Sequence, residues 1–247
     1  MDRRQYLASL GFRMLLSAAA MVVAARAAHE LRVDAAAWFL AMLVAGSATT
    51  LLVWPLVVPA GPGSVAHTLA PSFLLAGMFL LPTGPLVAAV AFAIALSGVV
   101  VGTRFHRLVY EISLGVLAYG GTSMLLRLTP QPTDAAMPSA TLAVTQALIA
   151  ASVLIAQLIV RSVLMRIERG SATPHWGAFR EHAIIEGLYC IALAVTISLL
   201  VRLHPALVAL VYAEVGIVWW VVSRFRRRIR ELTADADSSE EARSRAA

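Results

Sequence analysis

Long apolar runs recur along almost the whole chain, and they constrain its fold more than any other feature. There are eight of them, at residues 9–28, 35–58, 65–82, 84–102, 107–127, 140–166, 181–202 and 205–223. Most reach about 20 residues, the length of α-helix that crosses about 30 Å of hydrocarbon. Because unpaired backbone groups are not tolerated in lipid, we expect helices. The sequence predicts an all-α polytopic transmembrane helix bundle of about eight segments, within a range of six to eight.

Composition agrees with a membrane protein. Hydrophobic residues make up 60% of the 247 positions and charged residues only 14%, whereas soluble domains carry about 25% charged residues. The net charge of +6 could indicate nucleic-acid binding, but the arginines lie at the ends of the apolar runs. We therefore expect a lipid bilayer as the partner and no nucleic acid.

Two of the segments allow alternatives. Residues 65–82 and 84–102 are joined only by the turn LPTG, so they form either a tight hairpin or a partly re-entrant pair. The first segment, with the small-residue stretch AARAA at its end, fits either a cleaved secretory signal or an uncleaved helix. Arg13 interrupts this segment and favours the uncleaved helix.

The distribution of arginine predicts the orientation. With a cytoplasmic N-terminus, twelve arginines fall on the inner side and four on the outer side, which is the positive-inside pattern. We expect both termini in the cytoplasm and the chain in the bacterial plasma membrane. Residues 1–230 are predicted to form the integral membrane domain, and residues 231–247 a disordered cytoplasmic tail.

Two opposite charges are predicted to meet inside the membrane. Glu111 lies about 6 Å beyond the basic start of segment 107–127, and Arg161 lies about 7.5 Å before the exit of segment 140–166. Gly115 shares the Glu111 face, and small residues allow helices to approach closely. We predict a structural Glu111–Arg161 ion pair. The alternatives are that Arg161 reaches the headgroups and that Glu111 is protonated or near water.

Two other acids are candidates for a ligand or proton site. Glu214, beside Tyr212, lies near the middle of segment 205–223, and Glu186 lies about one turn into segment 181–202. Charged residues inside a membrane are functional candidates by default. Arg13 is a candidate partner for either acid. The alternative for each is a structural ion pair or a hydrogen-bonded protonated acid.

Motifs for catalysis and metal binding are missing from the sequence. It has no Walker loop, no GxSxG and no HExxH, and its six histidines are scattered near segment ends. Its one cysteine, Cys190, lies in an apolar run and is expected to pack there. We predict no enzyme activity, no cofactor and no metal.

Several features, in order, carry a resemblance to a known family. The first feature is the segment HTLAPSFLLAGMFLLPTGPLVAAVAFAIALSG, which is followed by the basic turn RFHR and the pair Tyr110–Glu111. Further along the chain, Arg161 lies nine residues before Gly170, and Trp176 and the arginine-rich RFRRRIREL follow. Over residues 35–230 this resembles the N-terminal membrane domain of bacterial HD-GYP and GGDEF signalling proteins. That family has asparagine at positions 111 and 161, and the complementary charges found here agree with a pair.

The resemblance implies a sensory input module, and we expect it to act without the catalytic output domain of that family. We expect a stand-alone module that signals to a separate cytoplasmic protein, which it would contact through Arg224, Arg226, Arg227, Arg228 and Arg230. One alternative is a small-molecule transporter subunit similar to the substrate-binding subunits of energy-coupling-factor importers, with Ala20 and Ala24 docking a transporter partner. The other is a structural membrane protein.

Overall fold

A computed structural model describes most of the chain, in two compact units. The described residues are 3–31, 35–53, 56–60, 63–67, 69–128, 139–169, 176–207 and scattered positions from 209 to 224. The first unit is Met1–Leu203 and the second is His204–Ala247. The predicted boundary at residue 230 and the predicted disordered tail lie outside the described residues.

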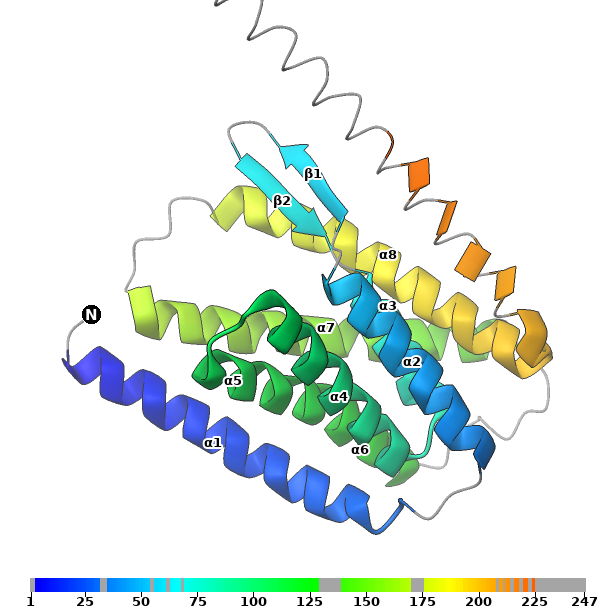
Figure 1. The fold of residues 1–247 in the computed structure, drawn as a ribbon, viewed down its shortest axis with the longest axis horizontal. Helices are drawn as coiled ribbons and strands as arrows, with labels where there is room; N and C mark the ends of the chain where they lie inside the picture. Colours follow the sequence, from blue (N-terminus) through cyan, green and yellow to red (C-terminus); the bar gives the residue numbers. More distant parts are fainter. Residues whose placement is uncertain are drawn as a thin grey trace, which may run out of the picture. The chain divides into compact units, whose positions relative to one another are not determined.

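The first unit is a helical bundle (Figure 1). Its helices include α1 (Arg3–Ala28), α2 (Ala35–Val53), α4 (Thr83–Val101), α7 (Ala140–Arg169) and α8 (Trp176–Leu203). A further continuous helix consists of α5 (Phe105–Gly115), the π-helix η1 (Val116–Gly121) and α6 (Thr122–Leu128). Within the described residues, six helical stretches are long and apolar enough to cross a membrane. This confirms the membrane-protein class, while the expected count of eight and the orientation stay predictions.

One expected segment is not a full-length helix. Residues 65–82 contribute only the helix α3 (Ala70–Leu80), whose 11 residues extend about 16 Å. Before α3, β1 (Leu56–Ala60) and β2 (Gly63–His67) form an antiparallel two-stranded hairpin. The expectation of helix is therefore wrong at the end of segment 35–58 and at the start of segment 65–82, where residues 56–58 and 65–67 are in strands. Most residues of α3 are buried, so other parts of the protein surround much of this short helix.

Proline and glycine set the turns on either side of α4. Pro82 precedes α4, and the backbone N–H of Leu81 donates to the carbonyl of Gly77 at 2.8 Å at the end of α3. Gly102 ends α4 with φ 74°, a left-handed conformation that glycine adopts without steric cost. The N–H of Thr103 then bonds to the carbonyl of Gly98 at 2.8 Å, which closes the turn into α5.

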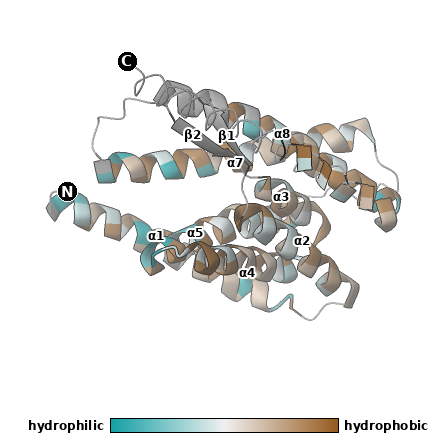
Figure 2. Cartoon of the chain, turned by 45° about the horizontal axis from the view of Figure 1, so that its top comes forward, coloured by the Kyte–Doolittle hydropathy of each residue, from teal (hydrophilic) through white to brown (hydrophobic). Residues whose placement is uncertain are grey.

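The helices of the first unit pack in neighbouring pairs. α2 packs on α4 and α3, α3 also packs on α8, and α8 packs on α7. α1 packs mainly on α5 and η1, as its course beside α5 in Figure 1 shows. Brown and pale residues cover most of these helices in Figure 2, and many large apolar side chains are exposed, among them Leu15, Val22 and Phe92. An apolar exterior fits a surface in contact with lipid.

Ala20 and Ala24, which the transporter alternative expects to dock a partner subunit, lie on the inner face of α1. Ala20 is buried in a cluster with Ala27, Val87 and Val116, and Ala24 packs against the same cluster. Both alanines therefore face the chain's own bundle. Their expected outward role in docking a transporter subunit does not agree with this packing.

The second unit begins with the short 3₁₀ helix η3 (Pro205–Leu207) and continues as helix at the described positions. The guanidinium of Arg224 lies over the ring of Trp220, 5.2 Å from its centroid. Such cation–π contacts are favourable, and this one fixes where the first residue of the basic segment points within this unit.

Candidate functional site

The inner face of α7 carries the polar side chains that the sequence groups into one stripe. Gln146 and Ala150 are buried, Gln157 is half-buried, and Arg161 follows one turn later. Glu168 continues this face to the end of the helix. Gln146 bonds to α8, Arg161 to α5 and Glu168 to α1, so α7 contacts three other helices through this face.

Glu111 of α5 and Arg161 of α7 come together in the structure. The Nη2 atom of Arg161 donates to Oε2 of Glu111 at 2.8 Å, and the two side chains are 49% and 27% exposed, respectively. The contact has the charge-assisted geometry expected for such a pair. Gly115 does not face α7, however, because a Cβ atom there would meet Val90 and Ile94 of α4. The predicted role of Gly115 in bringing α5 close to α7 is therefore wrong.

A second ion pair joins α1 to α7. Arg13 donates from Nη2 to Oε1 of Glu168, and the Ser9 hydroxyl donates to the same oxygen at 3.0 Å. The sequence offers Arg13 as a partner for Glu186 or Glu214. The sequence does not identify Glu168, because the apolar segment 140–166 ends two residues before it, whereas α7 continues to Arg169. A search for acids on the α7 stripe would have found Glu168.

Tyr110 lies between these two pairs. Arg13 lies over its ring, 5.7 Å from the centroid, and the residue is 4% exposed. Its buried hydroxyl has no hydrogen-bond partner among the described residues, nor has Nε of Arg13. We call Arg13, Tyr110, Glu111, Arg161 and Glu168 the α1–α5–α7 cluster.

Two hydrogen bonds between helices complete the polar interior. The hydroxyls of Ser17 in α1 and Ser113 in α5 lie 3.1 Å apart. At the opposite end of α7, Nε2 of Gln146 donates to the hydroxyl of Ser198 in α8 at 2.9 Å. Such contacts between membrane helices contribute about 0.6 kcal/mol each on average.

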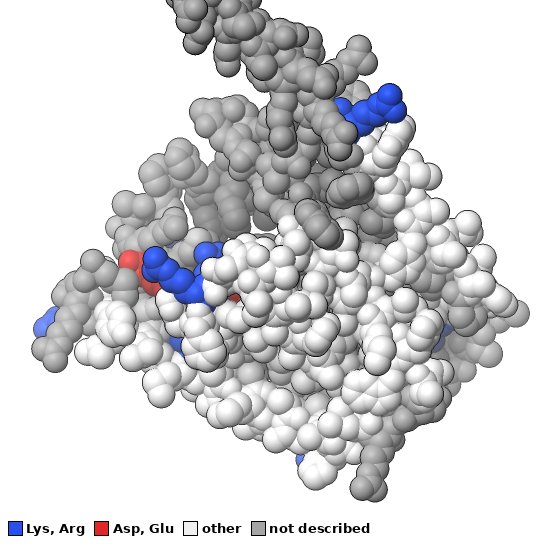
Figure 3. All heavy atoms as spheres, viewed as in Figure 1, with Lys and Arg blue, Asp and Glu red and all other residues white. Residues whose placement is uncertain are grey.

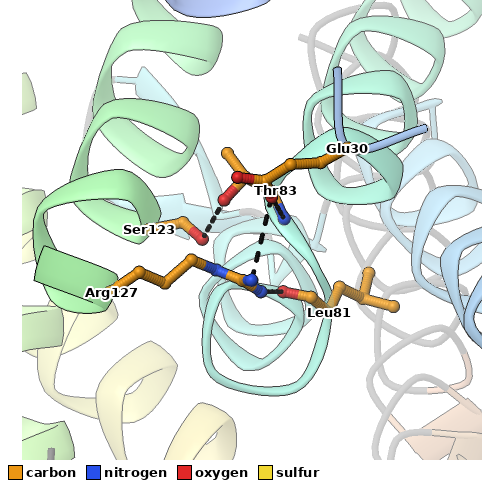
Figure 4. A network of polar contacts seen from close by, with 5 residues as sticks. All are labelled: Glu30, Leu81, Thr83, Ser123 and Arg127. Atoms are coloured by element: carbon orange, nitrogen blue, oxygen red, sulfur yellow. Dashed lines mark hydrogen bonds and ion pairs between the residues drawn. The ribbon is translucent and has the colours of Figure 1, made fainter. Parts of the chain in front are cut away.

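A second cluster surrounds the turn between α3 and α4 (Figure 4). Glu30, just after α1, accepts a hydrogen bond from the N–H of Thr83 at 3.2 Å and lies 3.7 Å from Nη1 of Arg127. Arg127 in α6 donates to the carbonyl of Leu81 at 3.1 Å. The Thr83 hydroxyl lies 3.3 Å from that of Ser123. We call Glu30, Leu81, Thr83, Ser123 and Arg127 the turn cluster.

Helix dipoles explain the signs of the charges in the turn cluster. The carboxylate of Glu30 lies at the N-terminus of α4, which attracts negative charge. The guanidinium of Arg127 lies at the C-terminus of α3, which attracts positive charge. Arg202 of α8 also donates to this end of α3, to the carbonyl of Phe79 at 3.5 Å. Sequence reasoning missed this cluster because its charges stand at segment ends.

The other candidate residues are spread over the chain. Glu186 lies half-buried in α8, and Tyr212 lies half-buried in the second unit. Glu214, Arg226, Arg227, Arg228 and Arg230 lie outside the described residues, while Arg224 is exposed.

The charges present suit helix pairing more than metal binding. In the part of the chain that the structure describes, no group of three His, Cys, Asp or Glu side chains could hold a metal ion. Figure 3 shows a face that is mostly white, with red and blue atoms next to one another on its left side. Further blue atoms lie apart from these, at the upper right and at the edges of the view.

Comparison with known proteins finds no matching family model, no matching curated protein and no matching solved structure. The resemblance to the membrane domains of signalling proteins therefore stays a prediction.

Proposed function

We propose that the chain is a non-catalytic, multi-pass sensory input module that signals to a separate cytoplasmic protein. The observation that carries this proposal is that charged side chains of the spanning helices pair with one another across helix interfaces. Four of them form the pairs Arg13–Glu168 and Glu111–Arg161, which connect α1 and α5 to α7. Such pairs set the relative positions of helices, and a change of helix position is how a membrane module passes on a signal.

The alternative of a transporter subunit has weaker support. Substrate pathways use ionisable residues that face a water-filled cavity, whereas these four charges contact each other across helix interfaces. Ala20 and Ala24, the residues proposed to dock a transporter partner, face the bundle. A purely structural role is the third candidate.

The route of output in this proposal is the basic segment at residues 224–230 of the second unit. Arg224 is exposed and precedes Arg226, Arg227, Arg228 and Arg230 in the sequence. A cluster of arginines at the cytoplasmic surface suits an acidic patch on a protein or anionic lipid. This basic segment is distant in sequence from the two ion pairs. In this proposal, therefore, one part of the chain receives the stimulus and another part contacts the cytoplasmic protein.

Co-purification from crosslinked cells tests this output route. One variant changes all five arginines to serine, and a matched control changes them to lysine, which keeps the charge. We expect a defined signalling protein to co-purify with the wild type and the lysine control, and to be lost with the serine variant. An unchanged set of partners in the serine variant would contradict the proposal.

Uptake measurements separate the transporter alternative from the sensory one. A transporter predicts uptake of a small molecule that is lost in Glu214→Gln, measured in cells that express the chain. Full retention of activity in that variant would leave Glu214 with a structural role.

A further inference from the structure

The helix at residues 105–128 changes its hydrogen-bonding pattern in the middle. α5 is α-helical to Gly115, η1 is a π-helix over Val116–Gly121, and α6 is α-helical from Thr122. A π-helical turn holds one more residue than the α-helical turn it replaces, and such turns occur often at functional sites. Conversion of η1 to α-helix would rotate α5 by about 100° relative to α6, since one residue corresponds to that angle.

The α-helices on both sides of η1 are fixed to other parts of the bundle. On the α5 side, Glu111 bonds to Arg161 of α7, and Ser113 lies 3.1 Å from Ser17 of α1. On the α6 side, Ser123 contacts Thr83, and Arg127 donates to Leu81 at the turn between α3 and α4. Both sets of contacts depend on the rotation of the helix that carries them.

Close packing surrounds η1 itself. It contacts α1, α3, α4 and α7, and a Cβ atom on Gly120 would lie 2.6 Å from a methyl group of Val87. Tyr119 is buried in η1 and its phenol lies beside Gln157 of α7. The Tyr110 hydroxyl, one helical turn before Ser113 on α5, is buried with no partner among the described residues. The observed rotation of α5 thus satisfies some of its polar groups and leaves another unsatisfied.

We infer that η1 is a one-residue register switch that couples the α1–α5–α7 cluster to the turn cluster. In the observed register both clusters form at once, and the extra residue is held in the π-helical turn. When the contacts at either end are released, η1 relaxes to α-helix and that end of the helix rotates. Glu111 and Arg127, sixteen positions apart in the sequence, stand about 24 Å apart along the helix, so the switch links opposite ends of the bundle.

The use of this switch for signalling rests on the proposed function, but the switch itself requires no partner protein. It has a specific energetic consequence. Releasing the first end also lets the π-helical turn convert to the more favourable α-helix, which offsets part of the loss of contacts. Releasing the second end brings no further relief. The loss from releasing both ends should therefore exceed the sum of the two separate losses, although sites this far apart normally add.

A thermal-stability cycle on the full chain in lipid nanodiscs tests the switch. One variant releases the α5 end with Glu111→Ala and Ser113→Ala, another releases the α6 end with Ser123→Ala and Arg127→Ala, and a third combines all four changes. We expect the fall in Tm of the third to exceed the sum of the other two. A fall equal to that sum overturns the inference.

Deletion of Ala118 provides the matched control, since it removes the extra residue while it keeps both ends in register. In the deleted chain we expect the two sets of substitutions to be additive. The same excess with and without Ala118 would overturn the inference, because coupling would then bypass η1. If the Ala118 deletion does not fold, deletion of Gly121 serves the same purpose, and the cycle in the undeleted chain remains decisive alone. Neither result depends on the co-purification of a partner.

Discussion

Arg13 in α1 and Glu168 in α7 form an ion pair although 155 positions separate them in the sequence. Apolar packing holds α1 against α5, η1 and α4. The ion pair, with the Ser9 hydroxyl on the same carboxylate oxygen, adds a polar contact that fixes α1 against α7.

Replacement of the acid in this pair should loosen α1. We expect Glu168→Gln to lower stability by on the order of 1–2 kcal/mol, because Arg13 loses its charged partner while the bond from Ser9 can persist. Thermal unfolding in detergent measures the loss. Ser9→Ala removes only one neutral donor and should cost less. Equal losses in the two variants would show that the charge of Glu168 is not what holds α1.

The pair between Glu111 and Arg161 should behave as a coupled unit. We expect Glu111→Gln alone to destabilise the protein by about 1 kcal/mol, since it leaves the guanidinium of Arg161 without its anion. Arg161→Gln in the same chain should largely restore stability, because two amides can bond to each other across the helices. Additive losses in a thermal assay would exclude an energetic pair.

The start of α4 should tolerate no side chain at Gly84. A Cβ atom there would lie 2.8 Å from backbone atoms of Ala27 and Glu30, and backbone cannot yield as a flexible side chain can. We expect Gly84→Ala to cost about 1–3 kcal/mol in unfolding free energy. Gly11→Ala is the matched control, because nothing lies within 4 Å of its Cβ position. That variant should be neutral or slightly stabilising, and equal losses at both sites would contradict the packing argument.

The sequence predicts the meeting of Glu111 and Arg161 because depth along a helix follows from residue count. Two antiparallel helices that begin and end at basic residues give both depths to within about a turn. Depth does not give the direction in which a side chain points. Gly115 illustrates the limit, since it packs on α4 rather than on α7.

The sequence does not predict the partner of Arg13 or the hairpin before α3, and the reasons differ. Glu168 lies past the last apolar residue of its segment, so hydropathy assigns it to the loop, whereas the helix continues to Arg169. Residues 56–67 mix apolar residues with proline and glycine, and hydropathy alone does not separate a short apolar strand from a helix. In both cases the local pattern is compatible with two structures, and contacts distant in sequence select one.

The long separation between Arg13 and Glu168 also has a consequence for assembly. A ribosome adds about 5–20 residues each second, so the 155 positions between them take roughly 8–30 s to synthesise. During that interval α1 is already made, and its guanidinium has no carboxylate from α7. The arginine can wait at the headgroups, where its long side chain reaches water. The docking of α1 on α7 is thus completed only after Glu168 has been synthesised, whereas its packing on α4, α5 and η1 can form earlier.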